Sequence, residues 1–325
     1  MSLVLGVDGG GTGSRAVLVE VPDSDGAGDG GLPEGMRELA RTTGGPAVAD
    51  GQADGPAVSE VVRVCRKALA EAGVEGPVDA LWAGLAGAGR AADSEGVEAG
   101  LQEAGLARRV AVGTDVGAAF HASFPVGAGI LLVAGTGSVA QARGAQGRTG
   151  RAGGWGPVVG DEGSGYSMGR SALQAVLQAE DGRGPATRLR GTLLEVLGIG
   201  AEAEKPGHEV VAWLATAERR TVARLAPLVV EVAADGDAVA SAVVRGAVFQ
   251  LVAHITALER ALGPWPEPPE VALAGGLLSP GAPLRGHMEE ALQGLEVRLV
   301  EGSPDAALGA AARAVELAGA GALEP

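Results

Sequence analysis

Apolar residues near the start of the chain fall into short runs that are separated by glycine-rich turns. Residues 3–7 form an apolar run that ends on Asp8, and a second run covers residues 16–19 after a turn of glycines. A strand, a glycine turn and a strand predict a β-hairpin, and residues 36–42 continue as a third strand. Three strands before any helix predict an antiparallel start to a sheet.

The rest of the first half alternates between helical and strand patterns. Apolar residues from Val58 to Leu69 recur at helical spacing and predict a helix with Cys65 on its core side. Residues 78–85 read as a strand, Ser94 can cap the next helix, and residues 109–113 read as another strand. The first half therefore predicts the order β-β-β-α-β-α-β, with a glycine-rich loop at residues 22–35.

The second half repeats this opening and then becomes mainly helical. Residues 129–134 and 139–143 predict strands around a glycine turn, and residues 149–151 predict a third. Helices follow from 167 to about 263, with Pro227 at a helix start and residues 238–262 in the longest helix. The later elements are expected as a strand at 270–274, a helix at 284–293, a strand at 295–300 and a helix at 304–317.

Repeated β-β-β-α units predict a duplicated α/β fold. We expect an N-terminal domain at residues 1–116 and a larger C-terminal domain, with a helical insertion, at residues 117–325. The length of 325 residues suits two domains.

Composition narrows the functional classes. Hydrophobic residues make up 46% of the chain and aromatic residues only 2%, so the core must be built from Ala, Val and Leu. The net charge of −15 opposes non-specific binding to nucleic acid. A single cysteine excludes an internal disulfide and a cysteine-only metal site. We expect a cytoplasmic protein, since no uncharged apolar run reaches about 18 residues and no signal peptide is evident.

Two strand–glycine–hydroxyl turns are candidates for binding phosphate. The first contains Gly10, Gly11 and Thr12, and its glycines would allow positive φ and close approach of an anion. Asp8 before it could hold Mg²⁺ through water, although a plain hairpin turn with a solvated Asp is equally consistent. The second turn contains Gly135, Thr136, Gly137 and Ser138, and two facing turns would grip the phosphates of one nucleotide. Neither turn matches the G-x-G-x-x-G or P-loop pattern.

Three further stretches could carry chemistry. Asp115 follows a strand and suits a general base, but spacing alone favours a role as the N-cap of a helix. The stretch GGWGPVVGDEGS at residues 153–164 could form a sugar pocket, or Asp161 or Ser164 could cap the helix that follows. Gly275 and Gly276 end a strand, where the backbone could pack against an adenine or ribose. The four histidines form no metal-binding pair.

In their order, these segments resemble the N-acetylglucosamine kinase group of the sugar kinase, heat-shock ATPase and actin superfamily. The segments that carry the resemblance are GVDGGGTGSRAVL, Thr114–Asp115, VAGTGSVA, GGWGPVVGDEGSGYSMGR and LAGG. The resemblance implies two ribonuclease-H-like lobes with ATP·Mg²⁺ and sugar in the cleft between them, and a homodimer as in many relatives. It implies phosphorylation of an amino sugar, either N-acetylglucosamine, to the 6-phosphate, or glucosamine.

The resemblance also implies roles for individual residues. It makes Asp115 the catalytic base and a sugar ligand, and Asp8 the residue that holds Mg²⁺ through water. The implied sugar contacts are Gly154, Trp155, Gly156 and Asp161. The implied nucleotide contacts are Gly10, Gly11, Thr12, Thr136, Gly137, Ser138, Ala223, Gly275 and Gly276.

One departure and two alternatives stay open. Relatives carry a sugar-binding Asn after the third strand, whereas residues 44–50 read GGPAVAD and contain none, so the sugar itself is in question. The related activator ATPases of acyl-CoA dehydratases bridge an iron–sulfur cluster with two cysteines per subunit, and this chain has only Cys65. A regulatory ATPase that phosphorylates no sugar, or a glycan-binding module, would share the fold.

Overall fold

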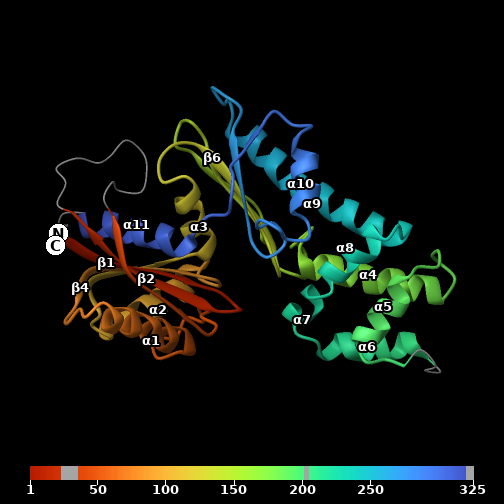
Figure 1. The fold of residues 1–325 in the computed structure, drawn as a ribbon, viewed down its shortest axis with the longest axis horizontal. Helices are drawn as coiled ribbons and strands as arrows, with labels where there is room; N and C mark the ends of the chain where they lie inside the picture. Colours follow the sequence, from red (N-terminus) through yellow and green to blue (C-terminus); the bar gives the residue numbers. More distant parts are fainter. Residues whose placement is uncertain (23–35, 201–204, 320–325) are drawn as a thin grey trace. The chain divides into compact units, whose positions relative to one another are not determined.

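The computed structural model describes residues 1–22, 36–200 and 205–319, which fall into two compact units (Figure 1). Unit 1 is Met1–Gly127 together with Pro304–Pro325, and unit 2 is Ala128–Ser303. Nearly all of the loop expected at residues 22–35 lies outside the described residues.

Unit 1 is built on a five-stranded mixed sheet in the order β3-β2-β1-β4-β5. Its strands are β1 (Ser2–Gly9), β2 (Ser14–Val21), β3 (Arg37–Gly44), β4 (Val78–Leu85) and β5 (Ala107–Gly113). The first three pair antiparallel, as the hairpin pattern predicts, and β1, β4 and β5 run parallel. The carboxyl ends of β1, β4 and β5 therefore share one edge of the sheet, where ligands commonly bind.

Helices cover both faces of this sheet. Helices α1 (Pro56–Glu71) and α2 (Ala91–Glu103) pack on one face, and α3 (Asp115–Ser123) and α11 (Ala306–Gly319) pack on the other (Figure 1). Cys65 of α1 is fully buried in the first of these cores, which confirms it as a core residue. The alternation of apolar residues along β1 divides the strand between the two cores: Leu5 and Val7 face α1, and Val4 faces α11.

Helix α11 lies directly against the backbone of β1. A Cβ atom added at Gly6 would lie 2.2 Å from the Ala311 backbone N and 2.4 Å from the Ala307 carbonyl oxygen. A Cβ at Gly309 would lie 2.1 Å from the Ala118 carbonyl oxygen of α3. These two glycines therefore let three backbones approach more closely than any side chain allows.

Unit 2 repeats the topology of unit 1. Its sheet has the order β10-β9-β6-β7-β8, with β6, β7 and β8 antiparallel and β6, β9 and β10 parallel. These strands are β6 (Gly129–Ala134), β7 (Ser138–Arg143), β8 (Thr149–Gly153), β9 (Glu270–Ala274) and β10 (Arg298–Leu299). The duplicated β-β-β-α arrangement predicted from the sequence is therefore confirmed.

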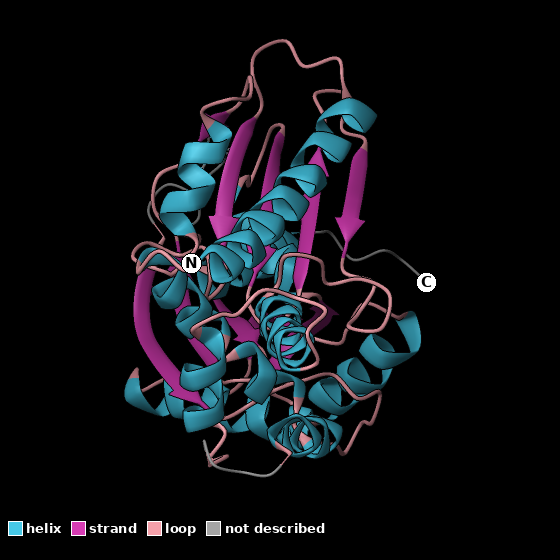
Figure 2. Ribbon diagram, turned by 90° about the vertical axis from the view of Figure 1, so that its right-hand side faces the viewer, coloured by secondary structure: helices cyan, strands magenta, loops and turns pink. Residues whose placement is uncertain are grey.

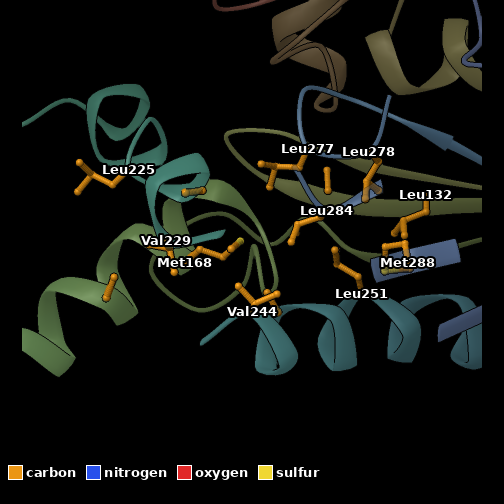
Figure 3. Close-up of a cluster of buried hydrophobic side chains, with 14 of the residues drawn as sticks. Leu132, Met168, Leu225, Val229, Val244, Leu251, Leu277, Leu278, Leu284 and Met288 are labelled. Atoms are coloured by element: carbon orange, nitrogen blue, oxygen red, sulfur yellow. The ribbon is translucent and has the colours of Figure 1, made fainter. Parts of the chain in front are cut away.

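A helical insertion between β8 and β9 supplies most of the core of unit 2, part of which Figure 3 shows. Its helices are among those drawn in cyan in Figure 2. The helices of unit 2 are α4 (Gly165–Glu180), α5 (Leu189–Val196), α6 (Pro206–Thr216), α7 (Arg219–Ala223), α8 (Ala226–Ala234), α9 (Ala238–Leu262) and α10 (Arg285–Leu292). Figure 3 shows Met168, Val244, Leu251 and Met288 among the side chains of this core. Helix α9 has the length and composition of a membrane span, but it places residues of one face in this core.

Four details of the sequence interpretation change. The units do not divide at residue 116, because α3 and the closing helix α11 both pack on the sheet of unit 1. Ser94 is not a cap: α2 begins at Ala91, and the Ser94 hydroxyl donates to the Ala91 carbonyl oxygen at 3.0 Å. The closing helix begins at Ala306, after Pro304. The strand expected at 295–300 shortens to β10, which pairs only at the edge of the sheet.

Candidate functional site

The first glycine turn joins β1 to β2 and leaves open space above its backbone. The register pairs Gly9 with Ser14, and the Gly10 amide donates to the Gly13 carbonyl oxygen at 2.9 Å. A Cβ atom at Gly10 or Gly11 would meet no atom within 4 Å. Neither glycine has a positive φ, contrary to the expectation from sequence. What they provide is space for a ligand to approach the backbone.

A cavity of about 310 Å³ opens beside this turn. Its lining is entirely polar or glycine: Asp8, Gly10, Thr12, Gly13, Ser14, Arg15, Thr43 and Gly44. Glu60 of α1 supports the wall by accepting hydrogen bonds from the Ser14 hydroxyl and the Gly45 amide. Backbone amides, hydroxyls and one guanidinium form a set of donors that suits an anionic ligand with several oxygens.

Asp8 and Asp115 lie at the same edge of the sheet of unit 1. Asp8 is the penultimate residue of β1, and Asp115 begins α3 two residues after the end of β5, which runs parallel to β1 through β4. Thr114, not Asp115, is the N-cap of α3, because its hydroxyl oxygen accepts from the Gly117 amide at 2.9 Å. Asp115 Oδ1 accepts from the Val116 amide at 2.9 Å. The alternative that Asp115 is the N-cap of the helix is therefore wrong, because Thr114 is the N-cap.

The Asp8 carboxyl lies among other charges. Burial is the main cause that raises its pKa from 3.8 to about 6, and the negative charge of Asp115 is the second. Asp305, which precedes α11, raises this pKa further, whereas Arg15 lowers it. Asp305 Oδ1 accepts from the Ala307 and Leu308 amides at 3.1 and 3.2 Å, and its Oδ2 pairs with Arg41 at 2.8 Å. The sequence interpretation missed Asp305, because 297 positions separate it from Asp8.

We expect Asp8→Asn to stabilise the ligand-free protein at pH 8. Between pH 4 and 6 the folded state binds more protons than the unfolded state, so the free energy of unfolding falls as pH rises. A pKa raised from 3.8 to about 6 means that, above pH 6, the ionised Asp8 lowers the free energy of unfolding by up to about 3 kcal/mol. Urea unfolding at pH 8 should show this gain, and at pH 4 most of it should vanish. The control is Asp54→Asn, at an exposed position. An equal change in the free energy of unfolding in the two variants would contradict the raised pKa of Asp8.

The first turn fits a magnesium ion held through water. The partly buried Asp8 carboxylate lies beside a second carboxylate, so its negative charge is poorly compensated, and a cation would offset it. No group of three or more His, Cys, Asp or Glu that could hold a metal forms among the described residues. Magnesium tolerates this arrangement, because it usually keeps several waters and binds one or two carboxylates together with substrate phosphates.

Unit 2 gathers a second set of predicted residues around the turn after β6. The Gly165 amide at the start of α4 donates to the Gly135 carbonyl oxygen at 2.8 Å, and the Tyr166 amide donates to that of Thr136 at 3.3 Å. A Cβ at Gly165 would lie 3.1 Å from the carbonyl oxygens of both Gly135 and Ala223. The proposed nucleotide residues Thr136 and Ala223 therefore lie on either side of the start of α4.

The turn after β9 joins the same group. Gly275 has φ +94°, and a Cβ there would lie 2.3 Å from the Ala134 carbonyl oxygen at the end of β6. The next residue, Gly276, has no atom within 4 Å of its Cβ position, and the Leu277 amide donates to the Ala134 carbonyl oxygen at 3.0 Å. Gly275 thus permits close contact between two parallel strands, and Gly276 leaves open space at their ends.

The segment from Gly153 to Ser164 connects the sheet of unit 2 to α4. Gly153, Gly154 and Gly156 all have positive φ, which explains why glycine recurs here. Trp155 is 78% exposed, and a side chain of this size seldom stays in solvent without a partner. Ser164 is the N-cap of α4, because its side chain accepts from the Ser167 amide.

Asp161 occupies a different place in this segment. It is only 5% exposed, has φ +58°, and pairs with Arg219 of α7 at 2.5 Å. Its Oδ1 accepts from the Ser138 amide at 3.4 Å, while the Ser138 hydroxyl donates to the Glu162 carbonyl oxygen at 2.7 Å. Asp161 therefore connects the predicted sugar segment to the predicted phosphate turn. Arg219 carried no local sequence signal, since it lies 58 residues from its partner.

The structure thus gathers the predicted residues into one set per unit. In unit 1 Asp8, Gly10, Gly11, Thr12 and Asp115 lie at the carboxyl edge of the sheet. In unit 2 the set comprises Thr136, Gly137, Ser138, Gly154, Trp155, Gly156, Asp161, Ala223, Gly275 and Gly276.

Comparison with known proteins gives two curated relatives. An N-acetylmuramic acid/N-acetylglucosamine kinase of Clostridium acetobutylicum is 29% identical over 202 residues, 62% of this chain and 64% of that protein. An N-acetyl-D-glucosamine kinase of Dictyostelium discoideum is 35% identical over 138 residues, 42% of each chain. The matched regions thus span less than two thirds of these relatives.

A solved structure resembles the whole chain. It is a candidate N-acetylglucosamine kinase of Chromobacterium violaceum, 30% identical, with a TM-score of 0.74 over 95% of this chain and 98% of that one. The duplicated five-stranded sheets are thus those of the sugar kinase and actin-like fold. A family model for the BadF/BadG/BcrA/BcrD ATPases matches residues 5–316. The chain therefore belongs to the BadF/BadG/BcrA/BcrD ATPase family.

Proposed function

We propose that this protein is an ATP-dependent kinase that phosphorylates an amino sugar, with N-acetylglucosamine, to the 6-phosphate, as first candidate. The observation that carries the proposal is the pair of carboxylates beside the polar cavity of unit 1. Asp8 borders the cavity, and Asp115 is near enough for its charge to raise the pKa of Asp8. Two carboxylates beside an anion-binding turn provide both a base and a charge partner for phosphoryl transfer.

Asp115 acts as the general base in this proposal. Its carboxylate takes the proton of the sugar hydroxyl as that oxygen forms a bond to the γ-phosphorus of ATP. The bond between this phosphorus and the oxygen that bridges to ADP breaks, so the products are the sugar phosphate, ADP and one proton. The position of Asp115 at the first residue of α3, close enough to Asp8 for its charge to act there, supports this role.

The remaining residues position the nucleotide and neutralise its charge. Gly10, Gly11 and Thr12 form the first phosphate turn, in which the glycines leave room for phosphate oxygens to approach and the Thr12 hydroxyl binds them. Asp8 would hold Mg²⁺ through water. When bound, Mg²⁺ would neutralise charge on the phosphates. In unit 2 the second phosphate turn comprises Thr136, Gly137 and Ser138, and the open space at Gly276 suits the adenosine together with Gly275 and Ala223.

The resemblance supports Asp115, Gly154, Trp155 and Gly156 as the sugar contacts. Trp155 offers an exposed aromatic face, and its neighbours Gly154 and Gly156 are partly exposed. Asp161 takes part by fixing this segment, since its carboxylate is buried against Arg219. Residues 44–50 lie beside the first turn, where the Ala47 amide donates to the Gly10 carbonyl oxygen at 3.1 Å. With no Asn there, glucosamine stays a candidate substrate.

The family name favours a second candidate function, an ATPase that regulates a partner without phosphorylating a sugar. The single cysteine, Cys65, argues against an activator ATPase that holds an iron–sulfur cluster. It is fully buried, and burial raises the pKa of its thiol to about 12. A buried thiol of this kind is inert as a metal ligand.

The experiment that separates the two functions measures ADP release from Mg²⁺·ATP with and without sugars. The panel comprises N-acetylglucosamine, glucosamine, N-acetylmannosamine and glucose. We expect release to depend on an amino sugar, with N-acetylglucosamine or glucosamine fastest. Equal release with and without every sugar would leave the regulatory ATPase.

We also propose that the enzyme acts as a homodimer in the cytoplasm. A kinase that consumes ATP needs the compartment that holds ATP, and the resemblance to dimeric sugar kinases supports the assembly. Light scattering after size-exclusion chromatography tests the dimer, and a single mass of about 32 kDa would exclude it.

A further inference from the structure

One residue that lines the cavity of unit 1 carries a positive charge and has no role in the function proposed above. Arg15 lines the cavity together with Asp8, Gly10, Thr12 and Thr43. It is the single basic residue in that lining. An arginine in a cavity of amides and hydroxyls indicates a ligand with negative charge.

The sheet register places Arg15 directly beside Asp8. The two residues are cross-strand partners in the antiparallel pair of β1 and β2, and Thr43 of β3 is the partner of Arg15 on its other side. Partners in a sheet point to the same face, with Cβ atoms about 5 Å apart. Thr43, Arg15 and Asp8 therefore form one row across the sheet, next to the turn of the β1–β2 hairpin.

Arg15 differs from the arginines that follow on the same sheet. Arg37 pairs with Glu20 at 2.8 Å, and Arg41 pairs with Glu38 at 2.6 Å and with Asp305 at 2.8 Å. Among the described residues the Arg15 side chain has no hydrogen bond or ion pair, although the charge of Asp8 is near. In a chain with a net charge of −15, an exposed and unpaired guanidinium beside a carboxylate remains available for a ligand.

We propose that Arg15 binds the polyphosphate chain of the nucleotide, with its guanidinium on oxygens of the terminal phosphoryl group. This inference rests on the proposed kinase function. The planar guanidinium offers two parallel N–H donors, which match two phosphate oxygens. Charge on the transferred group spreads over its oxygens during phosphoryl transfer, so a fixed cation there stabilises the transition state. Within this row, Asp8 would hold Mg²⁺ through water, and Arg15 would bind the phosphate oxygens.

The test compares Arg15→Gln and Arg15→Lys with a matched control, Arg37→Gln. Arg37 is an exposed arginine on the adjacent strand, and it is absent from the cavity lining. Calorimetry without sugar gives the affinities for Mg²⁺·ATP, Mg²⁺·ADP and AMP, and ADP release with sugar gives kcat and KM. Thermal unfolding reports whether each variant keeps its fold.

We expect Arg15→Gln to weaken Mg²⁺·ATP binding by about 10- to 100-fold, the range for loss of one or two charge-assisted hydrogen bonds. AMP affinity should stay within twofold, because AMP lacks the terminal phosphates. Arg15→Lys should recover part of the ATP affinity but little of kcat, since lysine cannot bind two oxygens in parallel. Arg37→Gln should match the wild type throughout.

Two outcomes would overturn the role of Arg15. Unchanged ATP affinity in Arg15→Gln would exclude phosphate contact, and an equal loss of ATP and AMP affinity would point to a general disturbance of the site. A lowered unfolding temperature with an unchanged ATP-to-AMP ratio would make Arg15 a structural partner of Asp8. These binding results do not depend on sugar, so they stand even if wild-type ADP release proves independent of sugar.

Discussion

Replacing Asp115 with Asn should lower kcat for sugar phosphorylation by about 10²- to 10⁴-fold, the usual contribution of a general base. The amide has the shape of the carboxyl group but cannot accept the proton of the sugar hydroxyl. Its side-chain oxygen can still accept from the Val116 amide, and the Thr114 cap of α3 is untouched. The fold of the site should therefore persist while the chemical step slows.

The same change should leave nucleotide binding intact. Asp115 raises the pKa of Asp8, so its neutralisation lowers that pKa and keeps Asp8 ionised over a wider pH range. We therefore expect the affinity for Mg²⁺·ATP to stay at or above the wild-type value while kcat falls. A separation of this kind distinguishes a base from a structural residue.

Asp93→Asn is the matched control. Asp93 is an acidic residue in the first turn of α2, as Asp115 is in that of α3, but it is not among the charges that shift the pKa of Asp8. Its replacement should leave kcat within twofold of the wild type. If Asp115→Asn also retained kcat within tenfold, Asp115 would not be the base, and the regulatory ATPase would become the better account.

The candidate residues of unit 1 could be found from the sequence because their signals are local. Glycines, Thr12 and Asp8 follow one apolar run, and Asp115 follows another. Parallel strands place their carboxyl ends on one edge, so the strand pattern alone brings the two carboxylates together. The predicted order of elements along the first half is confirmed, and in the structure β1, β4 and β5 run parallel.

What the sequence could not predict depends on contacts between distant residues. The Arg219–Asp161 pair joins positions 58 apart, and Asp305 affects Asp8 across most of the chain. Neither pair has a spacing that a periodic pattern would reveal. Arg15 escaped notice for another reason: in sequence it is one exposed residue of a strand, and only the register places it beside Asp8.

The predicted boundary between the two domains, at residue 116, differs from the observed units for a related reason. Helix α11 has the apolar pattern of any amphipathic helix, which does not specify the sheet that it covers. Its place is fixed by backbone contact at Gly6 and Gly309, and glycine in a strand often marks such an approach. Gly6 lies inside the first apolar run, where the sequence interpretation treated it as an ordinary strand residue.

Gly6→Ala should therefore be severely destabilising. The new methyl group would lie 2.2 Å from the Ala311 backbone N and 2.4 Å from the Ala307 carbonyl oxygen, so α11 must move away from β1. Overpacking of a core commonly costs about 1–3 kcal/mol, and a clash with backbone in place of a side chain belongs at or above the upper end of that range. We expect a cost of at least about 3 kcal/mol in urea unfolding, or a failure to fold.

The nature of the clash makes the prediction specific. Because the contacted atoms belong to the backbone of α11, shortening a neighbouring side chain, as in Gly6→Ala combined with Ala311→Gly, should not restore stability. Gly89→Ala is the control, since Gly89 is an exposed turn residue of unit 1 with no atom within 4 Å of its Cβ position. It should change the free energy of unfolding by no more than about 0.5 kcal/mol. An equal urea midpoint for Gly6→Ala and Gly89→Ala would mean that α11 is not seated on β1, and Asp305, which caps its first turn, would then lose its place beside Asp8.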